Sequence, residues 1–380
     1  MADWNTIADR LLASDGPAAI TCRQWLMPAA GRDAVIFPPT FAADGAGKSG
    51  YNIDTGDDKT PSIAILDTVG SQANRMEPLF KRVGEHDTPY SKLVPQIKIK
   101  AGNRPPVHLL DAGHRAADAI ARYSPLGPKL KEAFEAYQVN GDATRLAKLA
   151  PTSLVFGAWD SRGTGAKLPR IVEATIRAFD VKELKRSAQY NPPVDYIGLG
   201  LLDDAEDKKV LDAASELGFR HAPAAGTHGG VIVRGEIRRE AILSLVALRS
   251  IGPAGHNGVS LRRYVLGLAL LAMVHDREHN LRQGCLLVAD REKPPVWESV
   301  YHDGRREAFV PDCNAALEFA QGSAQAFVVG QGDVVQFDQN AANAAIKAQV
   351  DPKAKGRRKR GSTDEATQAG NTSGDTAPDA

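Results

Sequence analysis

Residues 65–80 of the 380-residue chain read ILDTVGSQANRMEPLF and join the end of a strand to the start of a helix. The apolar run SIAIL (62–66) predicts a buried strand. Apolar residues then recur at spacings of three and four: Leu66, Val69, Ala73 and Met76. Four polar side chains fall at or near the mouth of the predicted helix: Ser71, Gln72, Asn74 and Arg75. Helix N-termini favour negative charge and arginine binds phosphate as a fork, so this segment is a candidate anion site.

The order of strand, turn and helix is predicted twice more, over residues 105–124 and 153–181. Between them, residues 125–150 carry helical periodicity and are interpreted as an exposed helical insertion. DAVIFPPTF (33–41) is interpreted as a strand stopped by prolines, and REAILSLVALRSI (239–251) predicts an apolar helix. These mixed elements, with short and isolated strands, indicate the α+β class.

Composition is that of an ordinary globular protein, with 43% hydrophobic and 24% charged residues. A net charge of +1 gives no global argument for nucleic acid, although a local groove can still be basic. Three cysteines without a C-x-x-C pair argue against disulfides and zinc. The N-terminus has no apolar secretory region, and the longest apolar stretch (264–274) is too short to cross a bilayer. We expect a cytoplasmic protein without a membrane partner.

Residues 351–380 differ from the rest because small polar residues, glycine and proline dominate and no aliphatic core residue follows Val350. This composition predicts a disordered tail. Its basic block comprises Lys353, Lys355, Arg357, Arg358, Lys359 and Arg360. The block is either a solvated tail or a weak, non-specific phosphate contact.

Patterns that would indicate catalysis or a cofactor fail their context tests. AADGAGKS (42–49) fits a loose nucleotide-binding pattern, but the sequence after it cannot begin a helix. His275 and His279 have helical i, i+4 spacing without an evident third ligand. Asp67 and Asp160 end predicted strands, where an aspartate can act as an acid or base but more often caps a turn. We therefore expect no cofactor, no metal and no catalytic residues.

Glycine-rich loops with hydroxyl, amide or cationic side chains are the remaining candidate sites: 70–75, 157–167, 226–230 and 252–263. Glycine lets backbone amides approach an anion closely. The second loop adds Trp159, which could stack on a base, together with Arg162 and Lys167. The fourth ends in Arg262 and Arg263. The loops together favour a binder of a phosphate backbone, and the alternative is that they are ordinary turns.

The segments DTVGSQANRME (67–77) and WDSRGTGAK (159–167) resemble two hallmarks of a known family. It is the backbone RAMP subunit of type I-G (formerly I-U) CRISPR Cascade complexes, the GSU0053 family. VIFPPTFAADGAGKSGY (35–51) is similar to the family's early F-x-P-T-x-F region, with Phe41 where glycine is usual. The resemblance extends from about residue 15 to 340 and leaves out the tail.

The resemblance implies a single RAMP-like domain over residues 1–350, with an RRM-like (ferredoxin-like) palm and helical finger and thumb insertions. The palm would be a four-stranded antiparallel sheet with two helices. Copies of the chain would assemble head to tail along CRISPR RNA, with other Cascade subunits, and would present the guide to target DNA. Base pairing would read the sequence, and the protein would hold backbone and shape.

The first hypothesis is therefore a non-catalytic subunit that binds guide RNA. Its RNA-binding candidates are Ser71, Gln72, Asn74, Arg75, Trp159, Arg162, Lys167, Arg262 and Arg263. The alternative is a metal-dependent nuclease, because the equivalent subunit of related type III effectors cuts target RNA with a loop aspartate. Asp67 or Asp160 would then be the candidate.

Overall fold

A computed structural model describes residues 4–42, 50–57, 60–204, 206–253, 256–275 and 278–350. Most of the glycine–lysine loop (43–49) and the predicted tail (351–380) lie outside these ranges. The chain divides into two compact units. Unit 1 comprises the chain up to Leu79 with Arg170–Ser250 and Arg262–Ala326, and unit 2 comprises Phe80–Pro169, Ile251–Leu261 and the chain from Phe327 on.

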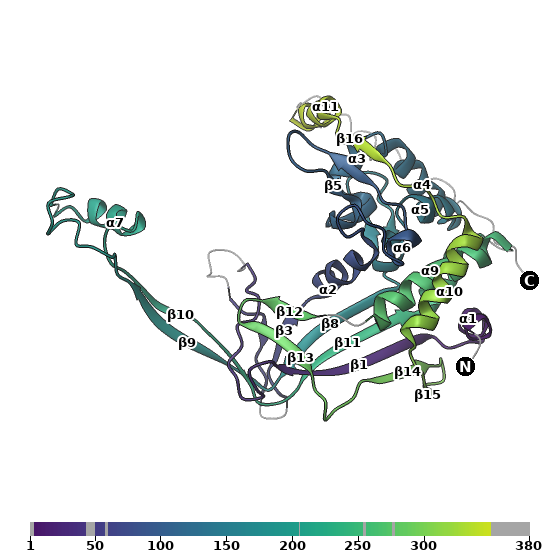
Figure 1. Ribbon diagram of the computed structural model, residues 1–380, viewed down its shortest axis with the longest axis horizontal. Helices are drawn as coiled ribbons and strands as arrows, with labels where there is room; N and C mark the ends of the chain where they lie inside the picture. Colours follow the sequence, from purple (N-terminus) through teal and green to yellow (C-terminus); the bar gives the residue numbers. More distant parts are fainter. Residues whose placement is uncertain are drawn as a thin grey trace, which may run out of the picture. The chain divides into compact units, whose positions relative to one another are not determined.

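Unit 1 is built on one large antiparallel sheet with helices on one side (Figure 1). The strands of unit 1 are β1 (Ala19–Pro28), β2 (Ile53–Asp54), β3 (Ile63–Asp67), β8 (Val172–Phe179), β9 (Val181–Tyr190), β10 (Ala222–Val233), β11 (Ile237–Ser244), β12 (His279–Arg282), β13 (Cys285–Ala289), β14 (Val296–Val300) and β15 (Arg306–Ala308). The helices that lie wholly or mainly in unit 1 are α1 (Trp4–Leu12), α2 (Val69–Met76), α7 (Lys208–Glu216), α8 (Leu245–Arg249), α9 (His256–Val274) and α10 (Cys313–Phe327).

The order of strands across the sheet is β12-β13-β1-β11-β8-β3-β2, with β14 paired to β1 and β15 paired to β14. The pairs β1–β13, β1–β11 and β11–β8 are all antiparallel. Along the chain, α2 comes between β1 and β8, whereas α9 comes between β11 and β13. Each of these helices therefore connects two strands that run in the same direction and are separated in the sheet by one antiparallel strand.

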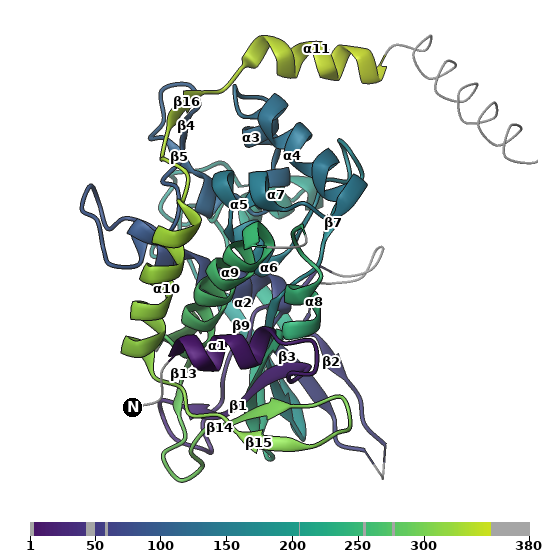
Figure 2. The ribbon, with the colours of Figure 1, turned by 90° about the vertical axis from the view of Figure 1, so that its right-hand side faces the viewer.

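Alternation along the strands explains which face of the sheet is covered. On β1, Ile20, Cys22 and Leu26 are buried, whereas Arg23 between them is exposed. β8 buries Ala174, Ile176 and Ala178 in the same period of two, which is the signature of a strand with one covered face. The covered face packs against α2, and Figures 1 and 2 show α9 and α10 on that same side.

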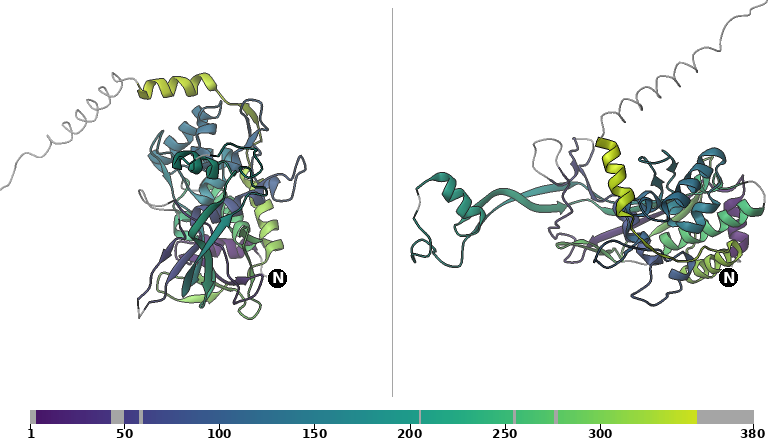
Figure 3. Two further views of the ribbon diagram at one scale, coloured as in Figure 1. Left: turned by 90° about the vertical axis from the view of Figure 1, so that its left-hand side faces the viewer. Right: turned by 90° about the horizontal axis from the view of Figure 1, so that it is seen from above.

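A long hairpin leaves the sheet between β8 and β11. β9 and β10 pair from Val181↔Val233 out to Tyr190↔Ala222. Figure 3 shows them as a two-stranded ribbon that runs beyond the sheet and carries α7 at its far end. β9 is exposed at most positions after Val181, and α7 has no buried residue. At its base Val181, Val231 and Val233 join the hydrophobic core, but beyond them the hairpin is held by its own ladder of hydrogen bonds.

Unit 2 is mainly helical with short strands. Its helices are α3 (Ala119–Arg122), α4 (Gly127–Asn140), α5 (Thr144–Leu149), α6 (Thr152–Phe156) and α11 (Gln339–Val350). Its strands are β4 (Lys98–Lys100), β5 (Val107–His108), β6 (Ala158–Trp159), β7 (Lys167–Leu168) and β16 (Val334–Gln336). α4 has Pro128 in its first turn and is capped at its C-terminus by Gly141 with φ 73°, which are usual start and stop signals.

Several expectations require correction. Residues 153–181 form a helix, a hairpin and then strand β8, the reverse of the predicted order, because the alternation in IVEATIRAF has the period of a strand. Residues 33–41 form only isolated bridges at Ile36 and Phe41. Residues 239–251 begin in strand β11 and become helical only at Leu245. The insertion at 125–150 is helical as predicted but not simply exposed, since Phe134 and Leu146 are buried.

Candidate nucleic-acid interface

The segment 65–80 forms the predicted junction of strand and helix. β3 ends at Asp67 and α2 begins at Val69, with Thr68 as the N-cap. The Ser71 backbone amide donates to Thr68 Oγ1 at 3.2 Å, so one of the free amides of the first turn is bonded inside the chain. The prediction that Ser71, Gln72, Asn74 and Arg75 lie near a helix start is confirmed.

Gln72 points into unit 1 rather than to solvent. Its side chain has no exposed surface and donates from Nε2 to Asp67 Oδ2 at 2.5 Å. Its Oε1 accepts from Arg239 Nε at 3.0 Å. Burial lowers the pKa of the Arg239 guanidinium, and the amide of Gln72 links it to the buried Asp67 carboxylate. In this conformation Gln72 is part of the interior and is not available to a ligand.

Arg75 is also bound within unit 1. Its Nε donates to Asp67 Oδ2 at 3.0 Å, and its Nη1 and Nη2 donate to the carbonyl oxygens of Asn280 and Leu281 at 3.1 and 2.9 Å. Its side chain is 30% exposed. Of the four polar residues, Asn74 is exposed and Ser71 is half-buried. Their role in RNA binding stays a prediction, and the geometry of Arg75 indicates a structural contact between α2 and β12.

The segment 157–167 presents a cationic and aromatic surface on unit 2. Strands β6 and β7 pair Trp159 with Lys167, and Lys167 Nζ lies 4.6 Å from the centre of the indole ring. Trp159 is 57% exposed, and Arg162 is exposed on the turn between the strands. The structure thus brings together three candidates that sequence spacing only suggested. The indole offers a stacking face, and the two cations can meet phosphates.

Asp160 holds the turn of this hairpin in shape. Its Oδ2 accepts from the Thr164 amide and hydroxyl at 2.7 and 3.0 Å, and its Oδ1 accepts from Arg122 Nη2. A Cβ at Gly163 would lie 2.3 Å from Asp160 Oδ2, so only glycine fits there. The interpretation of Asp160 as a turn-capping residue is confirmed by these hydrogen bonds.

The arginines of the fourth loop lie at the α9 part of unit 1. Arg263 Nη2 donates to Asn5 Oδ1 at 2.6 Å, its Nη1 pairs with Asp9, and its guanidinium lies 5.4 Å from the Phe319 ring centre. Arg263 therefore joins α9 to α1 and α10. Arg262 is half-buried. Arg262 and Arg263 belong to unit 1, whereas the β6–β7 hairpin that carries Trp159 (the Trp159 hairpin) belongs to unit 2.

The uncovered face of the sheet carries paired charges. Arg23 and Arg177 lie 3.6 and 3.7 Å from Glu240, and Arg306 lies 2.7 Å from Glu298. Glu173 lines the same face, so three glutamates offset the three arginines and the face presents little uncompensated positive charge to a phosphate backbone.

The sequence analysis missed the cations on the two-stranded stem of the β9–β10 hairpin. Lys182, Lys185 and Arg186 are exposed on β9. The signal was present in VKELKRS, a run of alternating charge with too few apolar residues to be buried on either face. The stem is a second exposed basic surface, and residues 226–230, predicted as a loop, form part of it: in strand β10, Thr227 pairs with Arg186 and His228 with Lys185.

The histidine pair does not share a helix. α9 ends at Val274, and His279 begins strand β12, so the i, i+4 spacing does not place both rings on one helical face. Within the described residues, no group of three or more His, Cys, Asp or Glu is placed to share a metal ion. None of the helices described here is both long and apolar enough to cross a bilayer.

Residues 20–183 match the family model of CRISPR-associated protein GSU0053. The matched segment begins in β1 and contains both α2 and the Trp159 hairpin. A comparison with curated proteins found no match. This segment therefore belongs to a CRISPR-associated family, which confirms the family resemblance; the RAMP role and the subtype stay predictions.

Proposed function

Because residues 20–183 belong to a CRISPR-associated family, we propose that the chain is a guide-RNA-binding backbone subunit of a type I-G Cascade complex. It is a non-catalytic subunit that assembles in several copies along CRISPR RNA. Other Cascade subunits join it in the cytoplasm, and target DNA is recognised through the guide.

The order of strands supports an RRM-like palm in unit 1. The order β13-β1-β11-β8, with α2 and α9 as connections, is that of a βαββαβ unit. β3, β2 and β12 extend this four-stranded core, and the β9–β10 hairpin takes the place of the thumb. The paired charges on the open face favour backbone contacts elsewhere over base stacking on the sheet.

The observation that carries the proposal is the Trp159–Lys167 pair. The Lys167 ammonium lies over the exposed indole of Trp159, and Arg162 is exposed on the adjoining turn. In single-stranded nucleic acid, bases stack on aromatic rings and phosphates pair with cations, so these three side chains match its chemistry. The pair lies inside the family-matched segment. The cations of the hairpin stem supply further sequence-independent contacts.

Co-expression with a CRISPR array tests this proposal. We expect the purified protein to carry RNA of guide length, and Trp159→Ala combined with Lys167→Ala to reduce the RNA recovered per protein. The control is Tyr301→Ala combined with Lys293→Ala, which removes one aromatic side chain and one lysine side chain from unit 1. Protein that purifies without RNA under these conditions would contradict the proposal.

The alternative is a metal-dependent nuclease with Asp67 or Asp160 as the catalytic aspartate. Both carboxylates are buried and bound to arginine, at 2% and 4% exposure. Magnesium-dependent cleavage of bound target RNA at fixed positions, lost in Asp67→Ala or Asp160→Ala proteins that still fold, would establish this alternative instead.

A further inference from the structure

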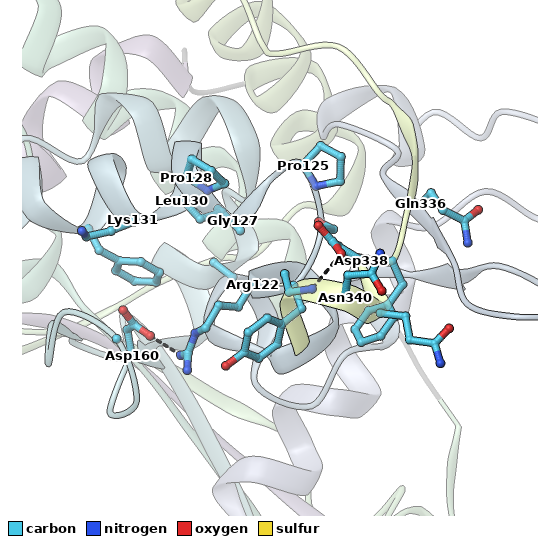
Figure 4. Close-up of a pocket in the computed structure, with 18 residues that line it drawn as sticks. Arg122, Pro125, Gly127, Pro128, Leu130, Lys131, Asp160, Gln336, Asp338 and Asn340 are labelled. Carbon is cyan, nitrogen blue, oxygen red and sulfur yellow. Dashed lines mark hydrogen bonds and ion pairs between the residues drawn. The ribbon is translucent and has the colours of Figure 1, made fainter. Parts of the chain in front are cut away.

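Unit 2 contains a pocket of about 1050 Å³. Its walls come from three parts of the unit: the end of α3 with the start of α4, the turn of the Trp159 hairpin, and the segment from β16 into α11. Figure 4 shows residues from each wall, including Arg122, Asp160 and Asn340. Small-molecule sites typically have volumes of roughly 300–1,000 Å³, so this pocket is large enough for a nucleotide.

The charged groups of the pocket balance, which argues against a simple anion site. Arg122 and Lys131 are offset by Asp160 and Asp338. The other walls combine the half-buried rings of Tyr123 and Phe337 with the buried Phe134. Side-chain amides come from Gln336, Gln339 and Asn340, and no hydrogen bond ties these amides to other described residues. Aromatic rings can stack on the face of a planar group, and side-chain amides can hydrogen-bond to its edges. This combination therefore suits a neutral, planar group with polar edges.

Arg122, in the wall of the pocket, is held in a defined orientation. Its Nη2 donates to Asp160 and to the Ala117 carbonyl oxygen, the latter at 3.3 Å. These are its hydrogen bonds within the described structure, and they leave Nε and Nη1 able to donate. The Arg122 side chain is 23% exposed. A guanidinium fixed at one edge and open at the other suits a carbonyl or ring nitrogen of a base.

The place of the pocket connects it to the proposed RNA surface. Asp160 and Gly163 line it, and their chain neighbours Trp159 and Arg162 are exposed on the same hairpin. We propose that the pocket receives one unpaired nucleobase of the RNA strand that lies over Trp159, Arg162 and Lys167. This inference rests on the proposed function and adds to it a base-binding site that is separate from the backbone contacts.

Photo-crosslinking of the full chain to single-stranded RNA that contains thiouridine tests the inference. We expect crosslinked peptides to include Tyr123 or Phe337. Two exposed wall residues permit blocking substitutions from opposite sides, Asn340→Trp on α11 and Lys131→Trp on α4. Each should abolish these crosslinks and weaken RNA binding about fivefold, the loss expected for one stacked base. The matched controls outside the pocket, Asn343→Trp and Lys129→Trp, should behave as the unsubstituted protein.

The outcomes separate the inference from the function on which it rests. RNA that binds normally but crosslinks elsewhere, or crosslinks that persist in both blocked variants, would overturn the pocket and leave the RNA-binding proposal intact. Blocked variants that bind RNA normally but lose a protein partner would make the pocket a protein site. Absence of any RNA binding by the unsubstituted protein would overturn both.

Discussion

Arg75 shows how a residue can fit a binding motif and still serve the fold. Its position at a helix start and its charge favoured a phosphate contact, but its guanidinium donates to Asp67 and to two carbonyl oxygens of β12. The partners at 280 and 281 are about two hundred positions away in the chain, so spacing around residue 75 could not reveal them. Trp159 and Lys167, by contrast, meet across a short hairpin, and a sequence reading could bring them together.

Arg75→Ala should therefore lower stability more than RNA affinity. The substitution leaves the Asp67 carboxylate, which is 2% exposed, with one fewer partner and frees two carbonyl oxygens. We expect the free energy of unfolding to fall by about 2 kcal/mol, as measured by urea denaturation. Arg291→Ala, an exposed arginine of the same unit, is the control. A stable Arg75→Ala protein with a shallower salt dependence of RNA binding would instead identify Arg75 as a phosphate ligand.

His108 gives unit 2 a sensitivity to acid. The residue is 5% exposed, its ring nitrogens have no hydrogen-bond partner within the described structure, and burial lowers the pKa of the imidazole. Asp111 nearby opposes this shift, whereas Lys81, Lys98 and Arg82 add to it. The folded state therefore favours neutral His108, and the unfolded chain takes up more protons below its ordinary pKa of about 6.5.

The free energy of unfolding of unit 2 should accordingly fall as the pH drops below about 6.5. In His108→Leu this dependence should become shallower, because the titrating group is gone. His86→Leu, at an exposed position of the same unit, should keep it. Denaturation series at neutral and mildly acidic pH measure the effect, and equal pH dependence in His108→Leu and the unsubstituted protein would refute it.

At the scale of elements, the β9–β10 hairpin carries two different surfaces. Its stem has exposed cations, whereas its far end has exposed apolar side chains on and around α7. Leu199, Leu201 and Leu217 are 64%, 61% and 73% exposed. Acidic residues lie among them, including Asp203, Asp204 and Glu206. An acidic, apolar end is poorly suited to a phosphate backbone, so we expect it to contact protein in the assembled complex.

Replacing Leu199, Leu201 and Leu217 together by serine should reduce assembly on guide RNA without changing the thermal stability of the free protein. All three side chains are more than half exposed, so the substitutions remove little core contact. Native mass spectrometry of complexes measures the number of copies per RNA. The matched control replaces Asp203, Asp204 and Glu206 by serine. Unchanged copy number in the leucine variant would show that the end of the hairpin is not an assembly contact.

At the scale of the molecule, local pattern predicted the α+β class, the buried strand at 62–66 and the helical character of residues 125–150. The prediction failed at β8. The glycine-rich turn before this segment suggested that a helix would follow, but the alternation of IVEATIRAF gives a strand in the middle of the sheet. The charge pairs on the uncovered face of the sheet depend on the register of its strands, and the pocket of unit 2 is lined by segments that are far apart in sequence. Such features follow from tertiary packing, which overrides local propensity.

The most direct test of the central claim is the salt dependence of RNA binding, because phosphate contacts release counterions. Single-stranded RNAs of several unrelated sequences should bind with similar affinity, and log K should fall linearly with log salt. Removing two cations in Arg162→Ala with Lys167→Ala should reduce the slope by about 1.4, at about 0.7 per phosphate contact on a single strand. Lys129→Ala with Lys347→Ala, two exposed lysines of the same unit, should leave the slope unchanged. Equal slopes for both double variants would contradict the assignment of the Trp159 hairpin as the RNA-backbone surface.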